Sequence, residues 1–221
     1  MDKQQKTIIY TDDGSTTIFN PNIGEHYHST HGALQESLHV FLMHGLAKIR
    51  CNEINIFEMG LGTGLNFLLS AAFAKQHNLM ITYAGLDKYP IENDIAETLN
   101  FSAHPGTDQG RVEKFHQLTW NEWHNFSANA RLLKTIGDIQ DFTFPTGIDL
   151  VYWDAFSPAV QPELWTEQIF SRIYHSMRSG GLLTTYCSRV VVQKALRASG
   201  FKVEKHPGPP GKREILNAIK V

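Results

Sequence analysis

The sequence predicts a Rossmann-like α/β fold: a mostly parallel sheet of seven strands with helices on both faces, preceded by a hairpin and a helix. Three observations support this fold class. From residue 51 onward, short apolar segments alternate with helix-like segments, which is the pattern of a parallel sheet. A glycine-rich stretch follows the first apolar segment, and an acidic residue stands at or just after the end of four of these segments.

The composition is that of a globular protein. Of the 221 residues, 42% are hydrophobic and 19% are charged, so the chain can bury a core of its own. Its two cysteines, Cys51 and Cys187, do not suggest a disulfide framework, and residues 1–6 are polar and lack the apolar stretch of a signal peptide. No segment is apolar over a length that would cross a bilayer. We therefore expect a cytoplasmic protein with no membrane partner.

Charge is distributed unevenly along the chain. The net charge of −2 does not indicate a nucleic-acid-binding protein, yet residues 188–221 hold eight Lys and Arg against two acidic residues. A basic end on an acidic body can bind a polyanion locally. The same pattern is common on solvated surfaces, which is the simpler interpretation on charge alone.

Residues 1–50 are expected to form an extension that packs on an α/β core domain of residues 51–221, so that both make one structural unit. Strand-like residues 8–10 and 16–19 flank a turn sequence rich in Asp and Gly, which predicts a hairpin. After a loop, a helix is expected over 33–49. Helical spacing places its apolar side chains on one face: Leu34, Leu38, Phe41, Leu42 and Leu46.

The core segments predict seven strands and five helices. The strands are expected at 54–58, 80–86, 131–136, 148–153, 182–186, 201–205 and 214–220. The helices are expected at 65–75, 91–100, 118–130, 162–177 and 190–198, with a loop at 101–110. Ligands of such a sheet bind at the carboxyl ends of the strands, near the point where the strand order reverses.

The first core strand runs into a turn that contains Gly60, Gly62 and Gly64. Glycines let the backbone bend sharply and approach a ligand closely, but such a turn alone serves several nucleotide cofactors. The dinucleotide fingerprint requires glycine where this chain has Leu65. Glu58 at the strand end would repel a pyrophosphate, whereas it suits the cationic methionine end of S-adenosylmethionine. The turn therefore favours a methyltransferase.

Acidic residues at three further strand ends fit the same cofactor. Asp87 is placed to accept hydrogen bonds from both ribose hydroxyls, although a surface Asp after a strand is an equally good interpretation of this residue alone. We expect Asp138 to accept a hydrogen bond from the adenine amino group, with Ile139 against the ring, and Asp154 to lie near the reacting methyl group. Together they predict a class I S-adenosylmethionine-dependent methyltransferase fold.

The chain carries the motifs DAFSP at 154–158, PELWT at 162–166 and KRE at 212–214, together with EMGLGTGLNF at 58–67, which is shared with many methyltransferases. With these motifs the chain resembles, over nearly its whole length, the methyltransferase domain of the bacterial MnmC family. Because the chain stops where the flavin-dependent oxidase domain of longer members would begin, the resemblance implies a stand-alone, MnmD-type enzyme without a flavin. Further matches lie at 27–29, 32–36 and 39–42.

The resemblance also implies a reaction. Members of this family use S-adenosylmethionine to methylate the 5-aminomethyl group of (2-thio)uridine at the tRNA wobble position, giving the 5-methylaminomethyl form. It implies tRNA as the partner, and separate oxidase or upstream modification enzymes as the source of the aminomethyl group. The chain departs from the family at Gln193 and Lys194, which stand where an Arg pair is usual; if that pair contacts tRNA phosphate, this chain has lost or relocated one contact.

Asp154 is our candidate catalytic residue. We expect its carboxylate to accept a hydrogen bond from the substrate amine and hold it in line with the methyl and sulfur atoms, and only secondarily to take a proton. The alternative is an Asp that caps the following segment. Tyr27 and Phe156, with Trp153 and Trp165, are candidates to receive the uracil base or are rings packed in the core or its rim.

Other polar residues leave alternatives open. Three basic residues are candidates for tRNA phosphate contacts or are plain surface charges: Arg189, Lys212 and Arg213. Three histidines cluster in one loop without a second group of ligands, so no metal is expected: His26, His28 and His31. Glu36 either faces the cofactor or belongs to a polar network.

Other functions fit parts of the same sequence pattern. Aminopropyl transfer uses the same fold with a decarboxylated cofactor and would also need Asp154 as an amine anchor, and so would methyl transfer to a small-molecule amine. A dehydrogenase is disfavoured by Leu65 and Glu58. A catalytically idle RNA-binding module would bind tRNA whether or not the cofactor is present.

Overall fold

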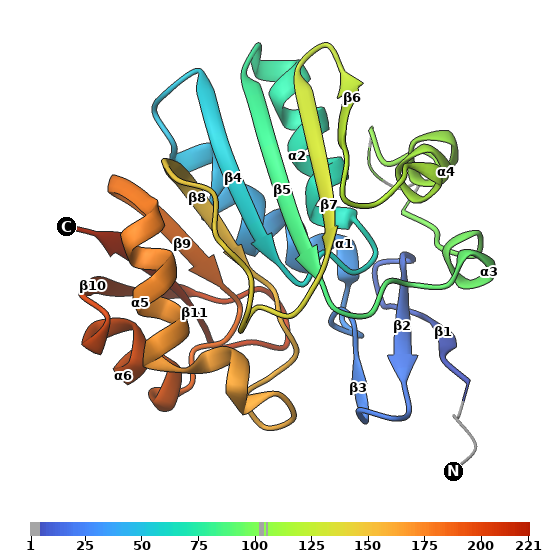
Figure 1. Ribbon diagram of the computed structural model, residues 1–221. Coiled ribbons are helices and arrows are strands. Elements are labelled where there is room, and N and C mark those ends of the chain that lie inside the picture. The colour runs from blue at the N-terminus through green and yellow to red at the C-terminus, as the bar shows by residue number, and fades with distance from the viewer. Residues whose placement is uncertain (1–4, 102–103, 105) are drawn as a thin grey trace.

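A computed structural model describes residues 5–101, 104 and 106–221. It contains an eight-stranded sheet in the order β10-β11-β9-β8-β4-β5-β7-β6 and a separate three-stranded sheet in the order β1-β2-β3 (Figure 1). The large sheet is mostly parallel in its centre and carries helices on both faces, which confirms the predicted fold class.

Five neighbouring strands in the centre are parallel. They are β4 (Glu53–Met59), β5 (Met80–Asp87), β7 (Ala130–Ile136), β8 (Ile148–Trp153) and β9 (Met177–Thr185). Every residue of β8 is buried, because both of its faces lie under helices. Alternate side chains enter two cores: Leu150 and Tyr152 enter one, and Val151 and Trp153 enter the other.

The sheet ends in antiparallel strands at both edges. β11 (Glu214–Lys220) pairs antiparallel with both β9 and β10 (Phe201–Pro207), as the predicted closing pair requires. At the other edge, β6 (Trp123–Ser127) pairs antiparallel with β7. The expected helix over 118–130 is therefore wrong, and the sheet has eight strands rather than seven. Of the five residues of β6, Phe126 alone is buried, so the segment has almost no strand-like alternation of apolar residues.

The helices agree with the sequence where their apolar pattern is strong. α2 (Leu65–His77) and α6 (Val190–Ala198) begin where predicted, and α5 (Glu167–Ser176) follows a 3-10 turn, η3 (Pro162–Trp165). α3 (Asn93–Ala96) is much shorter than expected. The expected loop at 101–110 lies partly outside the described residues, and its end begins α4 (Gln109–Gln117), a helix that was not predicted.

The two faces of the sheet have separate cores. α2 and α4 pack on one face through side chains such as Phe67 and Phe115. α5 and α6 pack on the other through side chains such as Phe170 and Leu196 (Figure 1). Within the described ranges, no helix combines the length and apolarity that a membrane crossing needs.

The N-terminal extension shares the core of the α2 face. β1 (Thr7–Tyr10) and β2 (Thr16–Asn20) form the predicted hairpin, to which a short β3 (Glu25–His26) is added. The predicted helix over 33–49 is divided into α1 (Ala33–Ser37), a π-helical segment η1 (Leu38–Met43) and a 3-10 turn η2 (Leu46–Lys48). Of the predicted apolar stripe, Leu38 alone is not fully buried: Leu34, Phe41, Leu42 and Leu46 belong to the core with α2. The first four residues of the extension lie outside the described residues.

Candidate active site

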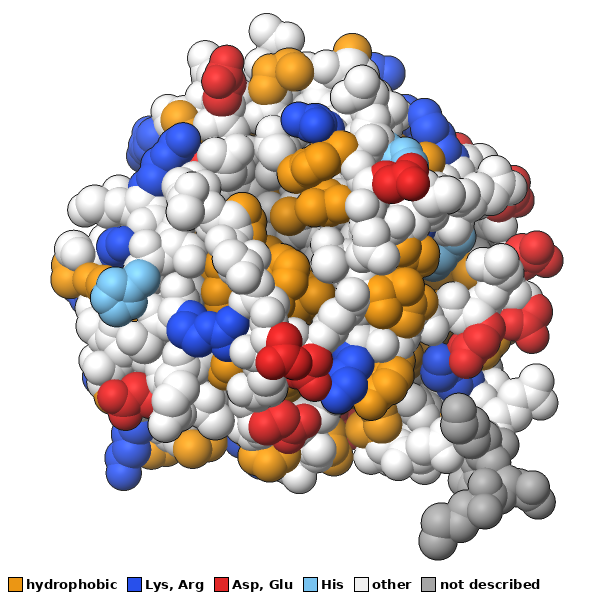
Figure 2. Space-filling model, in the orientation of Figure 1, with side chains coloured by type: hydrophobic (Ala, Val, Ile, Leu, Met, Phe, Trp, Pro, Cys, Tyr) orange, Lys and Arg blue, Asp and Glu red, His pale blue; other side chains and the backbone are white. Residues whose placement is uncertain are grey.

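A cavity of about 840 Å³ lies at the carboxyl ends of the parallel strands. The chain leaves β4 for β5 and β7 on one side and returns to β8 and β9 on the other, so the strand order reverses between β4 and β8. Loops after these strands line the cavity, and so do Asn20 and residues 22–29 of the extension. The volume lies within the usual range for small-molecule sites. Figure 2 shows hydrophobic side chains near the middle of this side of the molecule, with acidic and basic side chains beside them.

The three glycines of the turn after β4 have different surroundings. All have positive φ angles: +89° for Gly60, +47° for Gly62 and +77° for Gly64. A Cβ atom on Gly60 would lie 2.5 Å from the backbone oxygen of Asp154, and one on Gly64 would overlap the ring of Phe115. Gly60 and Gly62 line the cavity, whereas Gly64 packs against the core at the start of α2. The turn thus brings β4 and β8 close together while leaving backbone exposed to a ligand.

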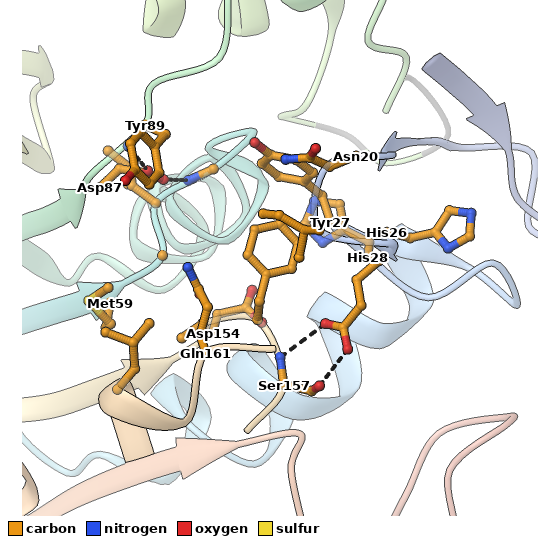
Figure 3. Close-up of a pocket in the computed structure, with 18 of the residues that line it drawn as sticks. Asn20, His26, Tyr27, His28, Met59, Asp87, Tyr89, Asp154, Ser157 and Gln161 are labelled. Atoms are coloured by element: carbon orange, nitrogen blue, oxygen red, sulfur yellow. Dashed lines mark hydrogen bonds between the residues drawn. The ribbon is translucent and has the colours of Figure 1, made fainter. Parts of the chain in front are cut away.

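Asp87 at the end of β5 holds this turn in place. One carboxylate oxygen accepts a hydrogen bond from the backbone N–H of Gly62 and the other from that of Tyr89, both at 2.8 Å (Figure 3). Burial raises the pKa of Asp87, while these two bonds lower it. Each oxygen keeps a second lone pair, so the carboxylate can still accept the two hydroxyls of a ribose.

Glu58 does not reach the cavity. Its side chain is fully buried, and it accepts hydrogen bonds from Asn66 Nδ2 at 2.8 Å and from the Tyr83 hydroxyl at 2.7 Å. Burial raises the pKa of Glu58 well above its usual value, and the nearby Asp154 adds to this. The sequence had suggested that Glu58 faces the methionine end of a cofactor. In the structure its side chain lies behind the cavity wall instead.

Asp154 lines the cavity and is connected to Glu58 through one side chain. Asn66 Nδ2, which bonds to Glu58, also donates to Asp154 Oδ2 at 2.8 Å. Burial raises the pKa of Asp154 to about 7; the negative charge of Glu36 adds to the rise, and Asn66 and Lys212 oppose it. Asn66, in the first turn of α2, was not singled out from the sequence, although it is a polar residue within an apolar helix.

Asp138 and Ile139 lie at the far end of the cavity, after β7. Asp138 accepts a hydrogen bond from the Gln140 backbone N–H at 3.0 Å and from Lys88 Nζ at 2.7 Å, and both lower its pKa. Ile139 is buried, with 1% of its surface exposed. An apolar side chain beside a polar acceptor is a suitable environment for a nucleobase.

The loop after β8 is held by side chains from three other segments. Glu25 of β3 accepts hydrogen bonds from both the backbone N–H and the hydroxyl of Ser157 (Figure 3). The Tyr186 hydroxyl donates to the Ala155 oxygen, and the Trp165 indole donates to the Phe156 oxygen, each at 2.8 Å. The backbone of residues 155–157 is therefore fixed beside Asp154.

The predicted aromatic residues fall into two groups. The rings of Tyr27 and Phe156 meet edge to face at a centroid distance of 5.1 Å, and both line the cavity. Trp153 is fully buried and Trp165 is 2% exposed, so both are core residues rather than surfaces for a base. Tyr27 and Phe156 are the members of this set that a ligand can touch.

The predicted basic residues are also divided. Arg189, just before α6, and Arg213 are exposed and do not line the cavity. Lys212 does line it, and its ammonium group is ion-paired with Glu36 of α1 and lies 3.9 Å from the centre of the Tyr186 ring. Lys212 is therefore part of the cavity wall rather than of an outer basic surface.

The three neighbouring histidines point to different partners. The His26 ring packs 4.9 Å from that of Phe19, His28 Nε2 lies 2.7 Å from the Thr63 hydroxyl, and His31 Nδ1 lies 3.1 Å from an Asp12 oxygen. In the described part of the chain, no group of three or more His, Cys, Asp or Glu residues is arranged to hold a metal ion.

The residues present fit S-adenosylmethionine. The cavity offers unsubstituted backbone at Gly60 and Gly62, a carboxylate with free lone pairs at Asp87 for the ribose, and an apolar contact at Ile139 for the adenine. When bound, this cofactor would supply an electrophilic methyl group on a sulfonium ion. Asp154 and the Tyr27–Phe156 pair line the same cavity and would face the methyl acceptor.

Comparison with known proteins gives relatives for most of the chain. A bifunctional protein named for tRNA 5-methylaminomethyl-2-thiouridine biosynthesis, MnmC from Nitrosospira multiformis, is 32% identical over 90% of this chain and 34% of its own length. The protein of the same name from Campylobacter hominis is 30% identical over 91% of this chain and 31% of its own length. The chain thus spans about a third of the length of these relatives.

Solved structures share the whole architecture. The crystal structure of MNMC2 from Aquifex aeolicus has a TM-score of 0.80 and 28% identity, covering 99% of this chain and 72% of that one. Spermidine synthase from Thermotoga maritima, with a TM-score of 0.52 and 13% identity, covers 97% of this chain and 73% of its own and shares the fold alone.

The family profile described as S-adenosyl-L-methionine-dependent methyltransferase matches residues 111–221, half of the chain. This stretch holds the strands β6 to β11, and with them Asp138, Asp154 and the loop at 155–157. The sheet order agrees with that assignment, and so does a cavity that fits the cofactor at the reversal of the strand order. The chain therefore belongs to the S-adenosyl-L-methionine-dependent methyltransferase family.

Proposed function

We propose that this enzyme transfers a methyl group from S-adenosylmethionine to the 5-aminomethyl group of (2-thio)uridine at the wobble position of tRNA. The observation that carries the proposal is the position of Asp154, a carboxylate of raised pKa in the wall of the cavity. The names of the two relatives described above refer to biosynthesis of the corresponding methylated nucleoside, which supports the same substrate.

The chemistry requires a neutral amine. A primary alkylamine has a pKa of about 10, judged from lysine, so most of it reaches the enzyme protonated. Asp154, with a pKa of about 7, accepts a hydrogen bond from the amine and orients its nitrogen toward the methyl group. The nitrogen–carbon bond forms as the carbon–sulfur bond breaks, and the proton released by the amine passes to Asp154 or to water.

The anticodon base must leave its stack to reach Asp154. Tyr27 and Phe156 line the cavity, and their rings are held at right angles by the extension and by the loop after β8. We propose that these two rings contact the extruded uracil and that the exposed Arg189 and Arg213 contact phosphates. Separate enzymes would supply the aminomethyl group, and no metal would take part.

The test is mass spectrometry of tRNA nucleosides from cells that lack the gene for this chain. We expect the 5-aminomethyl nucleoside to accumulate and the wild-type gene to restore the methylated form. A gene encoding Asp154→Asn should fail to restore it, whereas Asp94→Asn, an exposed carboxylate in α3, should restore it fully. Unchanged nucleosides in the deletion strain would refute the tRNA substrate, and a small-molecule amine would then be the acceptor to examine.

A further inference from the structure

An ion pair lies within the cavity wall. Glu36, which has 6% of its surface exposed, is paired with Lys212, and its other oxygen accepts a hydrogen bond from the Ser29 backbone N–H at 2.8 Å. The Lys212 ammonium also lies 3.9 Å from the centre of the Tyr186 ring. Glu36, Lys212, Ser29 and Tyr186 all line the cavity. The pair is therefore held in one place by a hydrogen bond and a cation–π contact.

Stability alone does not account for this arrangement. Glu36 is buried and the Lys212 side chain is 28% exposed, so the cost of removing the carboxylate from water offsets much of the attraction and the pair adds little net stability. The two residues are 176 positions apart in the chain and come from α1 and from the loop between β10 and β11. Their meeting at a ligand cavity indicates that a charged ligand uses them.

The order of the strands places the pair relative to the cofactor. Along the edge of the sheet stand Asp138 after β7, Asp87 after β5, Asp154 after β8 and Tyr186 after β9. A nucleoside with its ribose at Asp87 and its base toward β7 directs its 5′ substituent toward β8 and β9. Lys212, above Tyr186, lies on that side. Figure 3 likewise shows Asp87 and Tyr89 apart from the group formed by Asp154 and Ser157.

The other two lysines in the described cavity wall lie near the nucleoside half, Lys6 close enough to Asp87 to lower its pKa and Lys88 against Asp138. Lys6 is paired with Glu92 at 2.6 Å, and Lys88 with Asp138 at 2.7 Å. Burial lowers the pKa of His28 to about 4, so its imidazole is neutral at physiological pH. Lys212 is thus the cation positioned for the methionine half, and its ammonium has three N–H bonds, of which Glu36 uses one.

We propose that the Glu36–Lys212 pair binds the α-amino-acid end of the cofactor and thereby selects S-adenosylmethionine over its decarboxylated form. The methionine end carries an ammonium and a carboxylate on one carbon, and the pair offers the complementary charges. Lys212 attracts the carboxylate, and Glu36 attracts the ammonium. The proposal rests on the cofactor of the family and not on the tRNA substrate, so its test contains no tRNA.

The test is isothermal titration of the whole chain with S-adenosylmethionine and with decarboxylated S-adenosylmethionine, which keeps the amine and lacks the carboxylate. Loss of one charge-assisted hydrogen bond predicts that wild type binds the carboxylated form about tenfold to a hundredfold more tightly. Lys212→Met should remove most of this ratio by weakening S-adenosylmethionine alone, and Lys212→Arg should keep it. Glu36→Gln should weaken both ligands to a similar degree.

The matched control is Lys205→Met. Lys205 lies on the same hairpin and is ion-paired at 2.9 Å with Glu214, but the pair is exposed and does not line the cavity. This variant should bind both ligands as wild type does. Equal affinities of wild type for the two ligands would overturn the proposal without any variant. If Lys212→Met weakens the binding of both ligands equally, the proposal is also overturned, and the pair then only stabilises the position of the extension. The melting temperature of the variant confirms that it is folded.

Discussion

The side-chain amide of Asn66 joins Asp154 to a carboxylate that never reaches the cavity. Its two N–H bonds point to Asp154 Oδ2 and Glu58 Oε1, each at 2.8 Å, and its oxygen is buried without a hydrogen-bond partner among the described residues. Because α2 begins directly after the glycine turn, the first turn of this helix positions Asn66 between β4 and β8. The orientation and protonation of Asp154 therefore depend on the Asn66 amide, which lies beside it in the cavity wall.

Replacing Asn66 should change the pH dependence of the enzyme. The hydrogen bond from Asn66 lowers the pKa of Asp154, so Asn66→Ala should raise that pKa and move the acidic limb of kcat/KM to higher pH. The pH profile of methyl transfer checks this. Asn129→Ala is the control, since it removes an amide hydrogen bond to the Leu79 oxygen at the other end of the sheet. A limb that stays in place in Asn66→Ala would show that the amide does not tune Asp154.

The raised pKa of Asp154 should also appear in folding stability. The ordinary pKa of an Asp carboxyl is 3.8 and the pKa of Asp154 in the folded protein is about 7, so ionisation of Asp154 disfavours the folded state. The free energy of unfolding of wild type relative to Asp154→Asn should fall as pH rises from about 4 to about 7 and then level off, a change on the order of 2–4 kcal/mol. Chemical denaturation across this range measures it. A difference that is independent of pH would contradict the assignment.

The glycines of the turn should differ in the effect of substitution. Gly60→Ala places a Cβ 2.5 Å from the Asp154 backbone oxygen, so it should lower both the melting temperature and activity. Gly62→Val strains a backbone with a φ of +47° and meets the movable ring of Tyr27, 3.3 Å from the Cβ position, so it should lower the melting temperature and also weaken cofactor binding. Calorimetry and ligand titration separate the two effects. Gly180→Ala is the control, because Gly180 has a φ of +78° with no atom within 4 Å of a Cβ, and it should cost about 1 kcal/mol without affecting binding.

Replacing Glu25 should weaken the binding of the methyl acceptor more than that of the methyl donor. Its carboxylate holds the backbone and hydroxyl of Ser157, next to Phe156. Glu25→Ala should free this loop and raise KM for tRNA several-fold, while the Kd for S-adenosylmethionine stays within about twofold. Steady-state kinetics gives the KM for tRNA, and titration gives the Kd for S-adenosylmethionine. Glu25→Gln keeps an acceptor for Ser157, so its KM should lie between those of wild type and Glu25→Ala. A higher Kd for S-adenosylmethionine with an unchanged KM for tRNA would show that the loop contacts the methyl donor instead.

Strong local patterns made much of the fold predictable. The unbroken apolar run of β8 and the glycines that precede α2 are signals within a few residues, and both elements form as expected. β6 and α4 were missed because each buries few side chains: Phe126 in the strand, and Val112 and Phe115 in the helix. Their conformations are fixed by pairing with β7 and by packing on the core, which no short window of sequence contains.

The site was predictable where function follows from position at a strand end. Asp87 and Asp154 line the cavity after β5 and β8, as expected of residues that follow parallel strands. The place of Lys212 could not be derived, because its ion-pair partner Glu36 is buried in α1 and the local sequence shows a basic run alone. Asn66 was missed for a similar reason, since its role comes from two carboxylates on other elements.

Methyl transfer to an aminomethyl uridine can be measured with the purified protein. The enzyme is mixed with S-adenosylmethionine carrying a labelled methyl group and with tRNA that bears 5-aminomethyl-2-thiouridine. The tRNA is then digested, and its nucleosides are separated and identified by mass spectrometry. We predict label in 5-methylaminomethyl-2-thiouridine and in no other nucleoside, with Asp154→Asn binding the cofactor but transferring no label. If the wild-type protein binds the cofactor but leaves no label in that nucleoside, the proposed methyl transfer to tRNA is contradicted.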